Sequence, residues 1–146
     1  MKKGMAFVVL VLLGMSPLFA ADVEYYRPDS YKERNLPFSR AVRVGDLLFL
    51  AGDLGAKDGK LVEGGIEAEA RQTMENIKAT LAHYKLGMDN LVKCTVYLAD
   101  ISEWGRFNEI YAPYFDKNMP ARAALAVNGL ALGARVEVEC IAAFPD

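Results

Sequence analysis

The sequence predicts a two-layer α/β sandwich, in which one β-sheet packs against two helices within a single domain. Short segments rich in β-branched, aromatic and small apolar residues alternate with longer segments whose apolar residues recur every three or four positions. No repeat or internal linker divides this pattern, and 146 residues suffice for one core. The expected order is β-β-α-β-α-β-β, with strands over 41–44, 47–51, 91–98, 118–127 and 134–144, and helices over 66–86 and from 100 to about 115.

The first twenty residues are typical of a secretory signal peptide. Lys2 and Lys3 form a short basic start, residues 5–13 are apolar, and small residues lead to Ala20. The apolar run is short for a membrane span, so we favour a cleaved signal over a retained anchor helix. Residues 1–20 would be removed, and residues 21–146 would form a periplasmic or secreted domain with no membrane segment.

Composition and motifs exclude several classes of function. The formal net charge is −2 without a basic run, which argues against nucleic-acid binding. The glycines match no phosphate-binding loop, and no G-x-S-x-G nucleophile motif occurs. Two cysteines and one histidine do not make a credible metal site. Cys94 and Cys140 could pair if their strands are neighbours, but we favour two buried apolar side chains.

Turn and cap signals set the expected ends of the early elements. Residues 21–40 are polar and irregular, and we expect a lead-in arm. Gly45 at a first turn position suits a type II′ hairpin, and residues 57–60 carry a second tight-turn signal. Gly87 is placed as the C-cap of the long helix. That helix carries one apolar stripe, formed by Ile66, Ala70, Met74, Ile77, Leu81 and Tyr84.

The second helix should begin at Asp100, which forms a capping-box pattern with Glu103, and should end near Pro113. An aromatic stripe that includes Trp104 and Phe107 is expected to be its buried face. Because two helices cover only one face of a sheet, the other face needs a partner. We therefore expect an oligomer.

The last two strands form the expected closing hairpin and carry unusual charges. Arg122 lies on the first, while Glu137 and Glu139 share one face of the second. Arginine is the usual bidentate receptor for a carboxylate, and glutamate can orient or deprotonate water. On adjoining strands, Arg122 and Glu137 indicate either a site where water attacks a small carboxylate-bearing substrate or a structural ion pair, and both readings stay open.

Eight stretches occur in a characteristic order along the chain. The Pro-Ala-Arg element followed by an alternating glutamate strand is specific, and with the other stretches it resembles the RidA (YjgF) family over about residues 37–144. The stretches are Pro37-Phe-Ser, Ala41-Val-Arg-Val-Gly-Asp, Leu50-Ala-Gly-Asp-Leu-Gly, Leu61-Val-Glu-Gly-Gly, Val92-Lys-Cys-Thr-Val-Tyr-Leu-Ala-Asp, Phe107-Asn-Glu-Ile-Tyr-Ala-Pro-Tyr-Phe, Pro120-Ala-Arg-Ala and Val136-Glu-Val-Glu-Cys-Ile-Ala.

The resemblance implies a chorismate-mutase-like fold and a homotrimer with clefts at the subunit interfaces. It also implies cofactor-free hydrolysis of enamines and imines such as 2-aminoacrylate and 2-iminopropanoate to 2-keto acids and ammonia. Arg122 would clamp the substrate carboxylate, and Glu137 would position the hydrolytic water. Asn108 and Gly52 match further residues of the cleft.

Four positions differ from the family pattern. Phe38 stands in place of a cleft tyrosine, Ala51 in place of a serine, Asp53 in place of a glutamine, and Ala124 in place of a cysteine. The cleft thereby loses hydroxyl groups, and Asp53 would add negative charge if it faces the cleft. A non-catalytic trimer that binds a small carboxylate in the same cleft is therefore the alternative to an exported imine hydrolase acting on a 2-imino acid. A chaperone-like trimer acting through its surface has no specific support.

Overall fold

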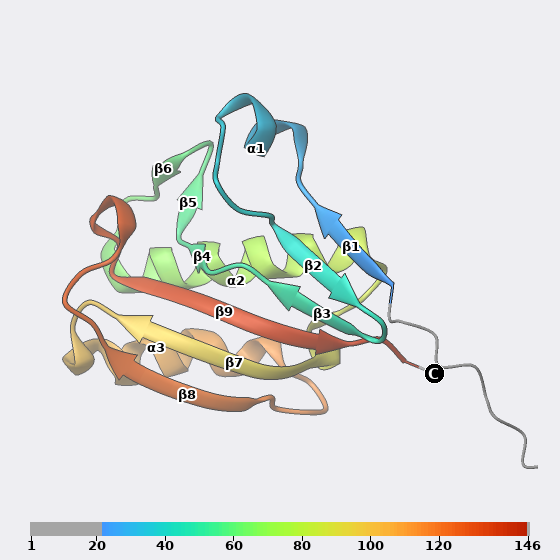
Figure 1. Ribbon diagram of the computed structural model, residues 1–146. Coiled ribbons are helices and arrows are strands. Elements are labelled where there is room, and N and C mark those ends of the chain that lie inside the picture. Colours follow the sequence, from blue (N-terminus) through green and yellow to red (C-terminus); the bar gives the residue numbers. More distant parts are fainter. Residues whose placement is uncertain (1–21, 146) are drawn as a thin grey trace, which may run out of the picture.

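The computed structural model describes residues 22–145, so the predicted signal peptide at residues 1–20 lies outside the described part of the chain. A mixed sheet has the strand order β1-β2-β3-β9-β7-β8, and a short β4 also pairs with β9. Helices α2 (Gly65–His83) and α3 (Trp104–Tyr111) pack on one face, which confirms the two-layer α/β fold (Figure 1). The strands are β1 (Val23–Tyr26), β2 (Ala41–Val44), β3 (Leu47–Leu50), β4 (Asp53–Leu54), β7 (Leu91–Leu98), β8 (Ala121–Ala126) and β9 (Val136–Ala143).

Both predicted tight turns are present. Gly45 joins β2 to β3 with φ 57°, the sign that the first position of a type II′ turn requires. A small hairpin of β5 (Ala56–Lys57) and β6 (Lys60–Leu61) turns through Asp58 and Gly59, whose φ values are 52° and 80°.

The long helix buries the predicted stripe but ends earlier than expected. Leu81 and its partners at spacings of three and four are buried in the core, and Tyr84 packs against it. The C-cap at Gly87 was wrong, because Lys85 takes the left-handed conformation (φ 59°) that closes the helix. The amides of Lys85 and Leu86 donate to the carbonyls of Ala82 and Leu81, as in a Schellman motif. Burial of the Leu86 side chain stabilises this earlier end.

The aromatic face of α3 is only partly as predicted. Phe107 and Tyr111 are buried, but Trp104, the first residue of the helix, is 46% exposed. Asp100 accepts a bond from the amide of Ser102 and caps a 3-10 turn (Ile101–Glu103) that leads into α3. The reciprocal bond of a capping box is replaced, since the Glu103 carboxylate pairs with Arg135.

The lead-in arm is ordered, contrary to the expectation of irregular structure. β1 pairs antiparallel with β2, and a short α1 (Asp29–Glu33) follows. β1 is an edge strand and three of its four residues are exposed, so no alternation of apolar and polar residues marked it in the sequence.

The predicted closing hairpin was wrong. β8 runs parallel to β7, with Arg122 opposite Cys94, and β9 runs antiparallel along the other edge of β7. The chain after β8 crosses the end of β7, where Val127 donates to Leu98 and Ala99 donates to Arg135. β7 is thereby hydrogen-bonded on both sides, which a local hairpin of β8 and β9 would not achieve.

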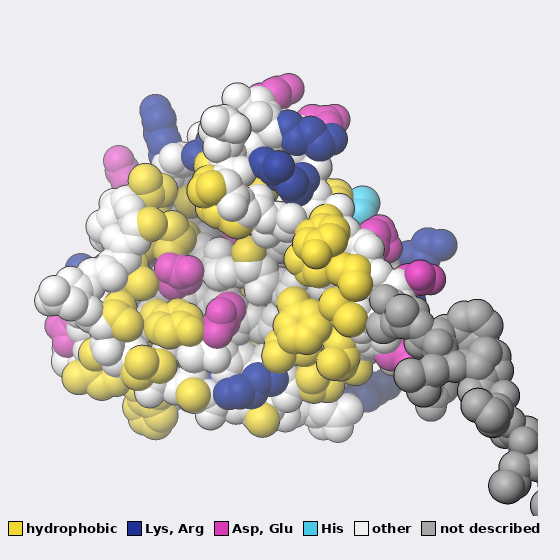
Figure 2. All heavy atoms as spheres, viewed as in Figure 1, with side chains coloured by type: hydrophobic (Ala, Val, Ile, Leu, Met, Phe, Trp, Pro, Cys, Tyr) yellow, Lys and Arg dark blue, Asp and Glu magenta, His cyan; other side chains and the backbone are white. Residues whose placement is uncertain are grey.

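The face opposite α2 and α3 carries exposed apolar side chains. Leu47 and Phe49 of β3 are each 41% exposed, and Phe49 lies opposite Ile141 of β9. Figure 2 views this face: hydrophobic side chains gather over β1 to β3, and acidic side chains stand over β9. Within residues 22–145, no helix has the length and apolar character needed to cross a membrane.

The two cysteines form a disulfide, so the interpretation as free apolar side chains was wrong. Cys94 and Cys140 lie directly opposite each other on β7 and β9, with their Cα atoms 4.1 Å apart. That separation is slightly closer than most disulfides have, as expected for an opposed pair on neighbouring strands. Because β7 and β9 are distant in sequence, the pairing of Cys94 with Cys140 could not be established before the register of the two strands was known.

Replacing both cysteines by alanine is expected to lower the free energy of unfolding by about 2–4 kcal/mol, because the unfolded chain regains the freedom of the loop that the bond closes. The two cysteines are 46 residues apart in the sequence, and this separation sets the length of the loop. Urea denaturation measures the effect, and each single alanine variant should lose most of the same stability. A double variant as stable as the wild type would contradict the prediction.

Candidate functional site

Arg122 lies against aromatic rings and forms no ion pair with a carboxylate of residues 22–145. Its strand, β8, is an edge of the sheet, and its side chain points to the face that α3 covers. The guanidinium carbon lies 4.7 Å from the centroid of the Tyr111 ring and 5.9 Å from that of Phe107. None of the ion pairs among residues 22–145 includes Arg122. The rings support a half-buried cation whose hydrogen-bond donors remain available to an anion.

Two buried polar atoms of α3 lack a hydrogen-bond partner within the described residues. They are Oδ1 of Asn108 and the hydroxyl of Tyr111. Burial raises the pKa of Tyr111 to about 12, against the lowering effect of Arg122, so this hydroxyl keeps its proton. Ala124 lies two residues after Arg122 and shares its face of β8. Orphaned polar atoms near an unpaired cation are typical of a binding site.

Glu137 lies on the opposite face of the sheet from Arg122. It pairs in register with Tyr97, whereas Arg122 pairs with Cys94 on the covered side of β7. Burial raises the pKa of Glu137, and the neighbouring Glu139 carboxylate raises it further. Glu139 accepts a 2.9 Å bond from the Tyr97 hydroxyl. A structural ion pair between Arg122 and Glu137 within one chain is therefore excluded, because β7 and the thickness of the sheet separate them.

Gly52 lies directly against the Glu137 carboxylate. A Cβ atom added at Gly52 would stand 2.0 Å from Oε1 of Glu137, which is a severe overlap. Gly52 falls in the short break between β3 and β4. Both strands pair with β9, and the pairing is interrupted at this break. Because glycine has no Cβ atom, the Glu137 carboxylate can lie directly against the backbone at this position.

Asp53 does not present a free negative charge. Its side chain is 5% exposed, and its two carboxylate oxygens lie 2.7 and 2.6 Å from the two Nη atoms of Arg40. Arg40 also donates to Oγ1 of Thr80 and to the carbonyl of Asn76. Burial raises the pKa of Asp53 to about 6, and the Arg40 charge opposes that rise. Sequence reasoning missed Arg40, whose only signal was a basic residue directly before a buried strand.

Phe38 and Gly52 line one cleft of about 720 Å³, together with Asp53. Phe38 is 47% exposed and meets the Tyr31 ring edge-on, with centroids 5.6 Å apart. Ala51 is half-buried beside this cleft, and its amide donates to the carbonyl of Arg40. The structure therefore divides the predicted site residues into two groups. Phe38, Ala51, Gly52, Asp53 and Glu137 form one, and Asn108, Arg122 and Ala124 form the other.

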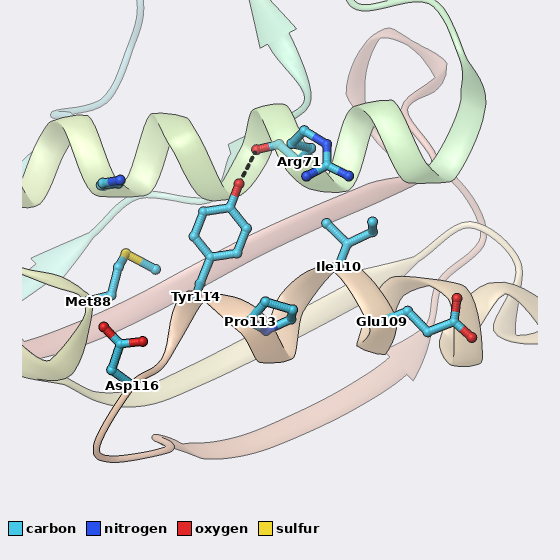
Figure 3. Close-up of a pocket in the computed structure, with 8 residues that line it drawn as sticks. Arg71, Met88, Glu109, Ile110, Pro113, Tyr114 and Asp116 are labelled. Atoms are coloured by element: carbon cyan, nitrogen blue, oxygen red, sulfur yellow. Dashed lines mark hydrogen bonds between the residues drawn. The ribbon is translucent and has the colours of Figure 1, made fainter.

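A second cavity, of about 580 Å³, opens between α2 and α3 and contains none of the predicted site residues (Figure 3). The Tyr114 hydroxyl donates to the Glu75 carboxylate at 2.8 Å and also lies 3.4 Å from the Arg71 carbonyl, the contact that the dashed line marks. Among residues 22–145, no three histidine, cysteine, aspartate or glutamate side chains gather as a metal site would require.

The fold and these two groups define a small two-layer α/β protein with a half-buried arginine on an edge strand and a glutamate on the uncovered face. The family model described as Endoribonuclease L-PSP matches residues 32–144, and the chain belongs to that family, the RidA/YjgF family.

Relatives and solved structures agree with this assignment. The 2-iminobutanoate/2-iminopropanoate deaminase of Mus musculus is 43% identical over 108 residues, which cover 73% of this chain and 80% of the mouse protein. The structure of the Rid-family protein YyfA from Yersinia pestis has a TM-score of 0.78 at 32% identity and covers 84% of this chain and all of its own. The structure of Escherichia coli TdcF with bound serine has a TM-score of 0.71 at 26% identity, over 75% of this chain and 89% of TdcF.

Proposed function

We propose that the protein is an exported homotrimer that hydrolyses 2-imino and 2-enamino acids to 2-keto acids and ammonia. The observation that carries the proposal is the Arg122 guanidinium, half-buried over the Tyr111 ring and free of any carboxylate within the described residues. Such a cation suits a substrate carboxylate, which it would bind through two parallel hydrogen bonds. The mouse relative named as a 2-iminobutanoate/2-iminopropanoate deaminase supports this substrate class.

The proposed site lies between two copies of the chain. Arg122 and Glu137 occupy opposite faces of one sheet, so a single chain cannot bring both to the same substrate. The β8 edge of one copy would meet the uncovered face of the next, on which Phe49 is exposed and Glu137 stands. Burying this apolar face would stabilise the assembly, and a closed ring of such contacts gives a trimer. Light scattering on a sizing column measures the state directly.

The chemistry requires orientation and proton transfer but no cofactor. Arg122 of one copy would hold the carboxylate of a 2-iminium acid and place its electrophilic C2 near Glu137 of the next copy. Glu137 would take a proton from water as the water oxygen bonds to C2, and would return it to the nitrogen of the resulting carbinolamine. Ammonia then leaves as the C–N bond breaks, and the hydroxyl proton passes to the Glu137 carboxylate or to water as the keto group forms. The raised pKa of Glu137 favours this use of the group as a base and then as an acid.

Ammonia release from freshly generated imines tests the proposal. An L-amino-acid oxidase produces the imines, and release should be several-fold faster with the protein than with buffer or with heat-denatured protein. The absence of acceleration for imines of alanine, methionine, leucine and phenylalanine would contradict the proposed activity.

Gly52→Ala is expected to lower kcat/KM for imine hydrolysis at least tenfold, because the added methyl group would displace the Glu137 carboxylate. Gly87→Ala is the matched control, since a Cβ at Gly87 meets nothing within 4 Å. The thermal unfolding of both variants is measured beside their kinetics. Full activity in Gly52→Ala would show that the position of Glu137 against this backbone does not matter.

A binding protein without turnover is the second candidate. The apolar side chains of Phe38 and Ala51 favour it, because they provide no hydroxyl to orient a substrate or water. The structure of TdcF with bound serine is a family example with a small carboxylate ligand. Thermal stabilisation by a 2-keto acid without imine hydrolysis, lost in Arg122→Ala, would favour this candidate.

The proposed export is supported by the buried disulfide between Cys94 and Cys140, a bond that persists in oxidising compartments. Fractionation of cells expressing the full chain, with mass measurement of the mature N-terminus, tests both the location and the cleavage after Ala20.

A further inference from the structure

We infer that the cleft beside Gly52 is a pocket for the substrate side chain, and that it selects 2-imino acids with large apolar side chains, of the leucine, methionine and phenylalanine type. The inference rests on the proposed function and adds the substrate class. It concerns the part of the cleft that lies beyond Gly52, between α1, the floor formed by α2, and Leu132.

The cleft exists because the sheet is split. β3 pairs with the end of β9 through Phe49, and β4 resumes the pairing at Asp53, so the chain diverges from β2 between them. α2 lies behind this opening and α1 stands above it (Figure 1). Asn76 and Thr80 of α2 form part of the floor, and Leu36 and Phe38 form part of one wall.

The size of the cleft exceeds what the smallest substrates need. Its volume is about 720 Å³. The six non-hydrogen atoms of 2-iminopropanoate occupy roughly the volume of four liquid water molecules, at about 30 Å³ each. A cleft several times larger than this matches ligands with longer side chains.

The lining favours an apolar side chain over a charged one. Leu36, Phe38, Leu54 and Leu132 contribute apolar surface. The charges of the floor neutralise each other, because Arg40 and Asp53 form a close ion pair. At this buried floor an acidic or basic side chain would find no free opposite charge, so its desolvation would oppose binding. The other charged residues of the lining, Arg34 and Asp58, are exposed to solvent.

Leu132 is the residue whose conformation points to a role at this cleft. It is 63% exposed and holds a left-handed backbone with φ 61° and ψ 6°, which is unusual for a side chain with a Cβ. The exposed leucine adds nothing to the core of the chain, and yet its strained turn places it on the lining of the cleft. Strain of this kind is frequent where a residue contacts a ligand.

The cleft adjoins the proposed reaction centre through Gly52, which both lines the cleft and contacts the Glu137 carboxylate. A 2-imino acid with C2 beside Glu137 can therefore direct its side chain into the cleft while its carboxylate faces the neighbouring copy.

The test compares kcat/KM for imines generated from L-alanine, L-leucine and L-phenylalanine, with the trimer or other native assembly of the full mature chain. The leucine and phenylalanine imines should exceed the alanine imine by at least about tenfold. Leu132→Gly should lower the leucine-to-alanine ratio about tenfold. Ile101→Ala, which truncates a 53% exposed side chain outside the cleft, should leave that ratio unchanged.

Binding of the keto-acid products separates this inference from the proposed activity. Calorimetry compares pyruvate with 4-methyl-2-oxopentanoate, and the larger acid should bind at least about tenfold more tightly. If no imine is hydrolysed but the larger acid still binds more tightly, the proposed activity fails and the side-chain pocket stands. Equal affinities, or hydrolysis of the alanine imine as efficient as that of the leucine imine, would overturn the pocket.

Discussion

Arg122→Ala should lower kcat/KM for imine hydrolysis by about 10²- to 10⁴-fold. Each hydrogen bond to a charged group contributes about 1.5–3 kcal/mol, and a bidentate clamp makes two, while every 1.4 kcal/mol corresponds to about tenfold in rate. The guanidinium rests on the Tyr111 ring and has no ion pair among the described residues, so its removal breaks no salt bridge that the fold needs. Initial rates of ammonia release measure the effect.

Two matched variants serve as controls for the Arg122→Ala result. Arg122→Lys keeps the charge but loses the planar fork, and should recover only part of the lost rate. Arg106→Ala removes an arginine that is exposed and paired with Glu67 on the surface, and should retain wild-type kinetics. Wild-type rates in a folded Arg122→Ala protein would remove Arg122 from the proposed site.

Arg40→Met should lower the free energy of unfolding by about 3–5 kcal/mol at pH 8, because it leaves Asp53 buried and ionised without a partner. The side chains of the pair are 15% and 5% exposed, so water can replace little of the lost interaction. Chemical denaturation of the mature protein provides the measurement. The double variant Arg40→Met/Asp53→Leu, which removes both charges, should recover most of the loss.

The loss in Arg40→Met should shrink as the pH falls. Burial raises the pKa of Asp53 from 3.8 to about 6. The contribution of this group to the free energy of unfolding is therefore fully present below about pH 3.8 and is lost as the pH rises through about 6. Without the Arg40 charge the pKa rises further, and the neutral carboxyl is then the stable form at pH 5. Denaturation at pH 5 and pH 8 should therefore give a smaller difference from wild type at the lower pH. An equal difference at both would show that Asp53 does not titrate in this range.

The Arg40–Asp53 pair also changes the meaning of a departure from the family pattern. An aspartate in place of a glutamine suggests extra negative charge in the cleft. In the structure Asp53 pairs with Arg40, and Arg40 also donates to a carbonyl of α2, so the charges on the floor of the cleft neutralise each other. A departure at one position is thus compensated at another, thirteen residues away.

The long helix, the central strands, the fold class and the family followed from local patterns, whereas β1 and α1 did not. The apolar stripe of α2, the β-rich run of β7 and the glycine turn at Gly45 each depend on neighbours in sequence, and the structure contains all three. The resemblance over residues 37–144 likewise depends on the order of motifs along the chain. Arg122 and Glu137 were recognised as candidates because their charges interrupt otherwise apolar strands.

Only the tertiary structure decided how these elements meet. Strand pairing between distant segments has no local code, so the insertion of β7 between β8 and β9 and the Cys94–Cys140 bond could not be read from spacing. The same pairing placed Arg122 and Glu137 on opposite faces of one sheet. The sequence alone identified Arg122 and Glu137 as the residues of the proposed site. Only the fold decided that one chain does not bring them together, because the direction of a side chain depends on strand register, and register is a property of the whole sheet.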